Sequence, residues 1–166
     1  HGMQRYFSIP LLFFFIASTL GLLLRWHFIS PLESVHYPYL LHAHSHIMFL
    51  GWVFNTLYLA YVNSYVRTKW ISRYRALFIM LQVLVLGMLI SFPLQGYGLF
   101  SIIFSTLHTI LAGVFLVLFF QDLKQENLKN SASVWFVKTS LFFFLLSSLG
   151  PFSLGFLMAN GLGQTN

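Results

Sequence analysis

The most informative stretch of the chain is Leu40-Leu41-His42-Ala43-His44-Ser45-His46-Ile47-Met48-Phe49-Leu50-Gly51-Trp52. It places three histidines within five residues, near the start of an apolar run long enough to span a membrane. A neutral imidazole is a good ligand for haem iron, copper or zinc. Because ionisable side chains are costly inside a bilayer, a group of them is expected to have a functional role.

The composition of the chain is that of a membrane protein. Of its 166 residues, 58% are hydrophobic and 7% are charged, whereas a soluble domain carries about 25% charged residues. The formal net charge of +6 comes from basic residues near the ends of apolar runs, which is a pattern of membrane topology. No cysteine is present, which excludes disulfides, thiolate ligation of haem and iron–sulfur clusters. A metal site would therefore use histidine, methionine or oxygen ligands.

Apolar runs long enough to cross a bilayer recur along the chain. A hydrocarbon core of about 30 Å needs roughly 20 apolar residues per helix, and about five runs reach that length. We therefore expect an all-α, polytopic membrane helical bundle that forms a single transmembrane domain over residues 1–166. Pro151 is expected to kink the last helix or to end its regular part. The expected helices are about 7–24, 38–66, 76–95, 99–121 and 134–160.

The basic residues set an expected orientation. The Gly96-Tyr97-Gly98 turn is uncharged, whereas the segments after the second and fourth expected helices are basic. The positive-inside rule then predicts a cytoplasmic amino terminus in a bacterial inner membrane, with the histidine cluster on the outer side. Arg25, on that outer side, is the exception. The basic residues of the two segments are Arg67, Lys69, Arg73, Arg75, Lys124 and Lys129.

Two conformations are open for the histidine cluster. On a helix, successive residues rotate by about 100°, so His42 and His46 share one face and His44 points to nearly the opposite side. One face would then supply a haem ligand, and the other could serve a second centre or a subunit contact. If the segment before Ile47 is extended, alternate residues point the same way. All three imidazoles could then converge on one metal ion.

His108, inside the fourth apolar run, is a further candidate ligand. Counting back from Gln121 at about 1.5 Å per residue places it about 10 Å below the outer boundary, whereas the same count places His46 close to that boundary. A haem held by these two histidines would be strained by the difference in depth. His36 is a reserve ligand, and His27 is expected to be an ordinary interfacial residue.

Two stretches carry a resemblance to a known family. Gly21-Leu22-Leu23-Leu24-Arg25 ends the first expected helix, and Leu41-His42-Ala43-His44-Ser45-His46, continued by Leu50-Gly51-Trp52, opens the second. Together they resemble the first two helices of haem–copper oxidase subunit I, in the branch of cbb3-type oxidases and nitric oxide reductases. The resemblance implies a low-spin b-type haem in the outer half of the membrane. Its axial ligand would be His42, His44 or His46, with His42 or His46 preferred, and Arg25 would meet its propionates.

The same resemblance implies a larger assembly. In that family, the second axial ligand and the copper ligands lie in later helices, so this chain is expected to be the amino-terminal part of a longer protein. It would transfer electrons toward the reduction of oxygen or nitric oxide, with copper in the full assembly. Its expected partners are the lipid bilayer, further helices of the same or another subunit, and an electron-donor protein. No nucleic-acid partner is expected.

Other functions remain open from the residues alone. A copper- or zinc-binding membrane protein for storage, delivery or sensing would use His42, His44 and His46, with Met48 or His36 nearby, and would show no Soret absorption. A non-catalytic structural subunit would use the histidines only as hydrogen-bonding groups. A transporter is less favoured, because the three acidic residues of the chain lie outside the expected apolar runs.

Overall fold

The chain is helical almost throughout. The computed structural model describes residues 2–31, 33, 35–125 and 132–159, and those residues contain no strand. The expected all-α fold is confirmed. The chain divides into two compact units, His1–Phe115 and Leu116–Asn166.

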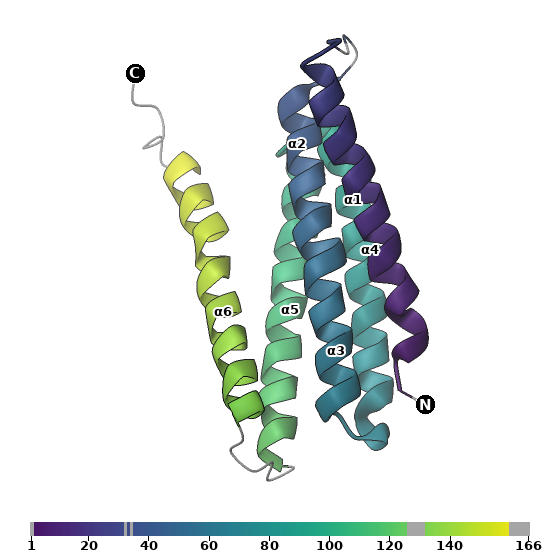
Figure 1. Ribbon diagram of the computed structural model, residues 1–166. Coiled ribbons are helices and arrows are strands. Elements are labelled where there is room, and N and C mark those ends of the chain that lie inside the picture. Colours follow the sequence, from purple (N-terminus) through teal and green to yellow (C-terminus); the bar gives the residue numbers. More distant parts are fainter. Residues whose placement is uncertain (1, 32, 34, 126–131, 160–166) are drawn as a thin grey trace. The chain divides into compact units, whose positions relative to one another are not determined.

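The first unit is built from long helical rods (Figure 1). A 3-10 helix, η1 (Gln4–Phe7), precedes α1 (Ser8–His27). One unbroken rod then comprises α2 (Tyr37–His46), the π-helix η2 (Ile47–Phe54) and α3 (Asn55–Tyr65). A second 3-10 helix, η3 (Thr68–Trp70), leads into α4 (Ile71–Gln95), and α5 (Leu99–Gln125) begins in this unit.

The second unit contains the end of α5 and α6 (Ala132–Ala159). Its buried apolar residues recur every three or four positions on both helices, which is the stripe expected on a helix that packs along one side. These residues are Leu116, Phe119, Leu123, Val134, Val137 and Leu141.

The observed helices match the expected ones in their centres and differ at their ends. α4 begins at Ile71 and not near residue 76, because arginines in its first turns can extend their charged ends to water. α5 runs on to Gln125, so Asp122 is helical and buried, contrary to the expectation that it lies outside the apolar run. α6 continues through Pro151, so the helix does not end there. The expected end of that helix at residue 160 and the tail after it lie outside the described residues.

Several helices have the length and composition of membrane spans. The segments Gln4–His27, Thr68–Gln95 and Leu99–Lys124 are each long and apolar enough to cross a bilayer. The continuous rod from Tyr37 to Tyr65 also exceeds the roughly 20 residues that a span requires. The chain is therefore an integral membrane protein.

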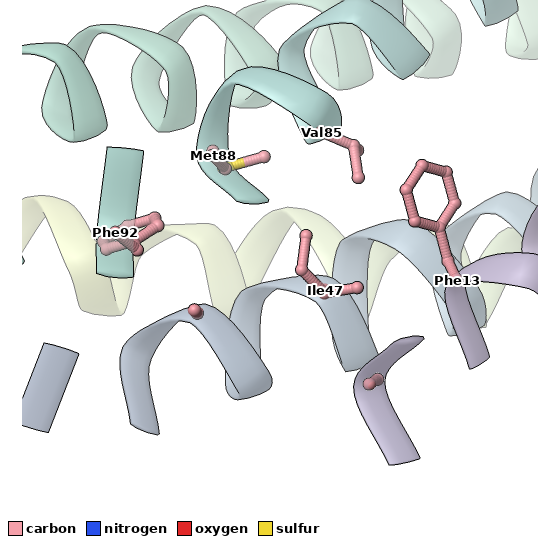
Figure 2. Close-up of a cluster of buried hydrophobic side chains, with 7 residues drawn as sticks. Phe13, Ile47, Val85, Met88 and Phe92 are labelled. Carbon is pink, nitrogen blue, oxygen red and sulfur yellow. The ribbon is translucent and has the colours of Figure 1, made fainter. Parts of the chain in front are cut away.

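The core of the first unit joins α1, the α2–η2 rod and α4. Fully buried Ala17 and Ala43 lie on α1 and α2, and small residues of this kind let membrane helices approach closely. Figure 2 shows Ile47 of η2 facing Val85 and Met88 of α4. The close approach explains why the rod carries its histidines directly against α1 on one side and α4 on the other.

Gly51 and Gly96 are each required by a close contact. A β-carbon at Gly51 would lie 2.9 Å from the Phe13 ring and 3.2 Å from Val85, so only glycine leaves room for this packing. Gly96 has a φ of 57°, a conformation that side chains other than glycine rarely adopt, and a β-carbon there would collide with the ring of Tyr39. The turn at Gly96 places Tyr97 beside the α2 histidines.

A buried pair of amides connects α3 to α4. The Asn55 Nδ2 donates to Gln82 Oε1 at 2.8 Å, and the Gln82 Nε2 donates to Asn55 Oδ1 at 3.1 Å. Each amide also donates to a backbone carbonyl of its own helix, that of Gly51 or Phe78. Both side chains are buried, so this pair supplies a specific polar contact inside an apolar bundle.

We expect N55L and Q82L each to destabilise the bundle by about 1–3 kcal/mol, because each leaves the other amide buried without its partner. The double variant N55L/Q82L should lose less free energy of unfolding than the two single variants lose together. Unfolding by sodium dodecyl sulfate in mixed micelles measures these differences.

T56V serves as the matched control, because Thr56 bonds only within its own helix, to the Trp52 carbonyl. If the losses in free energy of unfolding caused by N55L and Q82L simply added in the double variant, the two amides would not be coupled.

Candidate functional site

The histidine cluster lies on a regular helix, which separates its members. α2 is α-helical from Tyr37 to His46, so the extended conformation that would let all three imidazoles converge is wrong. The expected helical arrangement is confirmed: the rings of His42 and His46 lie on one face, and the ring of His44 contacts a different helix. The cluster therefore forms two separate environments.

His44 faces α1. Its Nδ1 lies 2.9 Å from the carbonyl oxygen of Ala17. A carbonyl oxygen only accepts, so the Nδ1 carries the proton in this bond. Gly21, one turn further along α1, lets the ring approach closely, since a β-carbon there would lie 3.0 Å from His44 Cε1. The Nε2 lone pair of the neutral ring is left available for a ligand.

A cavity of about 400 Å³ opens beside this histidine, between α1 and α2. The exposed guanidinium of Arg25 and the imidazole of His44 supply its charged and titratable groups. The wall is otherwise largely apolar, which suits a ligand that is flat and hydrophobic with an anionic edge. The lining residues are Gly21, Leu24, Arg25, Phe28, Tyr37, Leu41 and His44.

The opposite face of α2 is filled by aromatic rings. The His42 ring lies 4.4 Å from that of Tyr97, and the His46 ring lies 4.2 Å from that of Phe92, between ring centroids. The His46 Nδ1 donates to the His42 carbonyl oxygen at 3.0 Å. Partial burial of Tyr97 raises the pKa of its phenol, which stays protonated at neutral pH. These rings pack closely on His42 and His46 and occupy the space beside them.

His108 is buried within the first unit, on α5. It is 1% exposed, and its Nε2 has no hydrogen-bond partner among the described residues. Its ring packs against Phe54 with 5.3 Å between centroids. Phe54 is the last residue of η2, which continues directly from the helix of His42 and His46.

The two remaining described histidines contact tyrosines at the same end of the bundle. The His27 ring lies 5.5 Å from that of Tyr37, and the His36 ring lies 5.1 Å from that of Tyr39. In the described part of the chain, no group of three or more histidine or acidic side chains is placed to hold a metal ion. His42, His44 and His46 thus do not form one three-ligand site within this chain.

The π-helix η2 begins directly after His46. π-Helical segments are rare and frequently occur at functional sites. Here, the segment from Ile47 to Phe54 lies between the histidines and the buried amide of Asn55, which donates to the Gly51 carbonyl inside it. Hydropathy and helical propensity do not distinguish a π-helix from an α-helix, so sequence reasoning could not have found this feature.

Two other contacts of the histidines could not be predicted from the sequence, for a similar reason. The Ala17 carbonyl is a backbone group with no sequence signal, and Phe92 resembles any other apolar residue of its helix. Tyr97 had a partial signal, because it lies between two glycines in an uncharged turn.

The fold and the site together define an α-helical integral membrane protein with a divided histidine cluster at one end of its bundle. No protein-family model, curated protein or solved structure matches the chain.

We expect the neutral forms of His44 and His46 both to carry the proton on Nδ1, because both donate from this atom to a carbonyl oxygen. Nitrogen-15 NMR of histidine-labelled protein in micelles at alkaline pH identifies the tautomer of each ring. H44Q and H46Q assign the two signals. A proton on Nε2 of His44 would contradict the bond to Ala17.

Proposed function

We propose that this chain binds a b-type haem and transfers electrons toward a site that reduces oxygen or nitric oxide. The proposal follows the resemblance of its first two helices to haem–copper oxidase subunit I. One structural observation carries it: His44 and Arg25 line the same cavity. Of the three histidines that the resemblance leaves as candidates, His44 is the one beside the arginine that would meet the propionates.

His44 has the properties required of an axial ligand. Metal-binding histidines usually donate their second ring nitrogen to a carbonyl or carboxylate, which orients the ring and raises the basicity of the ligating nitrogen. The Ala17 carbonyl does this for His44. By contrast, the rings of His42 and His46 pack against those of Tyr97 and Phe92. We therefore assign the ligand to His44, although the helical face pattern alone favoured His42 or His46.

The remaining lining residues suit a haem. The Arg25 guanidinium can donate two parallel hydrogen bonds to a propionate carboxylate. Leu24, Phe28 and Leu41 supply apolar walls, and such walls control the solvent access and polarity around a haem. When bound, the haem iron supplies one-electron redox chemistry. His108 does not line this cavity, so the second axial ligand would come from further helices of the same subunit or from another subunit.

A haem titration tests the assignment of His44. Purified protein in detergent should bind one haem with a shifted Soret band, and adding imidazole should convert this haem to a low-spin form by supplying the second ligand. H44A should abolish both effects, whereas H42A and H46A serve as matched controls and should retain them. R25Q should weaken haem binding about tenfold or more, because it removes a charge-assisted contact.

The outcomes separate this proposal from its rivals. An H44A protein with an unchanged spectrum would contradict the assignment. Stoichiometric copper or zinc without a Soret band would favour a metal-binding protein for storage, delivery or sensing. A chain that binds neither haem nor metal would favour a structural subunit.

The orientation in the membrane is a separate part of the proposal. The amide nitrogen of Met3 donates to Asn63 Oδ1 at 2.8 Å, which ties the amino-terminal end to the end of α3. Arg5 therefore lies at the same end of the bundle as the basic η3–α4 segment. The positive-inside rule places this end in the cytoplasm and the His44 cavity on the outer side.

Cysteine labelling tests this orientation cleanly, because the chain contains no cysteine. We expect S30C, at the end of the bundle that carries the His44 cavity, to react with a membrane-impermeant maleimide on intact cells. T68C, at the basic end, should react only after the cells are broken. The reverse result would contradict an outer haem site.

A further inference from the structure

The end of the bundle opposite the histidines carries a second cavity, of about 400 Å³. It is lined by residues 2–6 together with Ile71 and Arg75. The amino-terminal segment thus forms one wall, and the start of α4 forms the other. Arg5 and Arg75 approach this cavity from separate elements, η1 and α4, and both side chains are exposed.

No acidic residue lines this cavity beside Arg5 and Arg75. Glu33 is the only acidic residue in the sequence of residues 1–115, and it lies between α1 and α2 at the other end of the bundle. The Arg5 guanidinium donates to the Tyr6 hydroxyl at 3.1 Å, and this neutral partner brings no negative charge to the cavity. The cavity is therefore suited to an anion.

The surroundings of the cavity are those of a membrane interface. Trp70 and Tyr6 lie at this end of the bundle, and these aromatic side chains favour the headgroup level of a bilayer. Lys69 and Arg73 pack over the Trp70 ring, at 4.7 Å and 4.2 Å from its centroid. One turn into the membrane, α1 exposes apolar side chains such as Leu11 and Phe15.

We propose that this cavity binds the phosphodiester headgroup of an anionic phospholipid between Arg5 and Arg75. A guanidinium matches the geometry of a phosphate group and can donate to two of its oxygens at once. Basic pockets between membrane helices are known to bind anionic headgroups. A lipid is favoured over free phosphate because the site lies at membrane-interface level, beside apolar helix surface that acyl chains can cover. The proposal is independent of the haem site and of which leaflet this end occupies.

Lipid retention tests the proposal on the full chain in detergent. Native mass spectrometry should detect one phosphatidylglycerol retained per chain, with phosphatidylcholine retained at least about tenfold less. R5Q/R75Q should lower phosphatidylglycerol affinity by about tenfold or more. Circular dichroism checks that this variant is folded, and the exposure of both side chains makes the substitutions mild.

R67Q/K69Q is the matched control, because it removes two charges from the same end of the bundle without touching the cavity lining. It should change the affinity by less than about threefold. Equal losses in the two double variants would overturn the site in favour of a diffuse charge effect.

Two further outcomes would also overturn the lipid assignment. Equal retention of phosphatidylcholine would remove the requirement for an anionic headgroup. Complete displacement of phosphatidylglycerol by millimolar inorganic phosphate would identify a site for free anions. If R5Q/R75Q failed to fold, the unaltered chain would still test the proposal. Its retention of phosphatidylglycerol would be compared with that of phosphatidylcholine and measured again in the presence of inorganic phosphate.

Discussion

The lipid bilayer constrains this protein more than any single side-chain contact. Backbone amide and carbonyl groups have no water to bond in the hydrocarbon core, so a spanning segment must be helical. The histidine segment from Tyr37 to His46 is such a helix. Because each residue turns by about 100°, His44 is directed away from its neighbours His42 and His46. The division of the cluster into two environments follows directly from this constraint.

Close packing of the helices then gives each environment its chemistry. Ala17, Ala43 and Gly51 allow α1, the α2–η2 rod and α4 to approach until backbone atoms and side chains of neighbouring helices touch. On one side, this approach lets the Ala17 carbonyl bond the imidazole of His44. On the other side, the same close approach packs the His46 ring against the Phe92 ring. Larger residues at these positions would separate the helices and remove both contacts.

The polar chemistry of the first unit is concentrated at its two ends. One end has Arg25 and His44 beside a cavity, and the other has Arg5 and Arg75 beside another. Between them, the bundle is mostly apolar, and the amides of Asn55 and Gln82 bond each other within it. The buried Nε2 of His108 and the buried hydroxyls of Ser91 and Ser101 have no hydrogen-bond partner among the described residues. An apolar middle with functional groups at the ends is suited to ligands that enter from the membrane interfaces.

Residue pattern alone was enough to predict an all-α membrane bundle, the approximate positions of its helices, and the shared face of His42 and His46. These are local properties, because hydropathy, helix length and the rotation per residue need no knowledge of neighbouring helices. The three-dimensional packing was needed to show that His44 bonds Ala17 and shares a cavity with Arg25, that Asn55 pairs with Gln82, and that Ile47–Phe54 forms a π-helix. These features depend on which helices are adjacent and how each is rotated about its axis. Side-chain packing between distant segments sets that rotation, and the pattern along any one helix does not encode it.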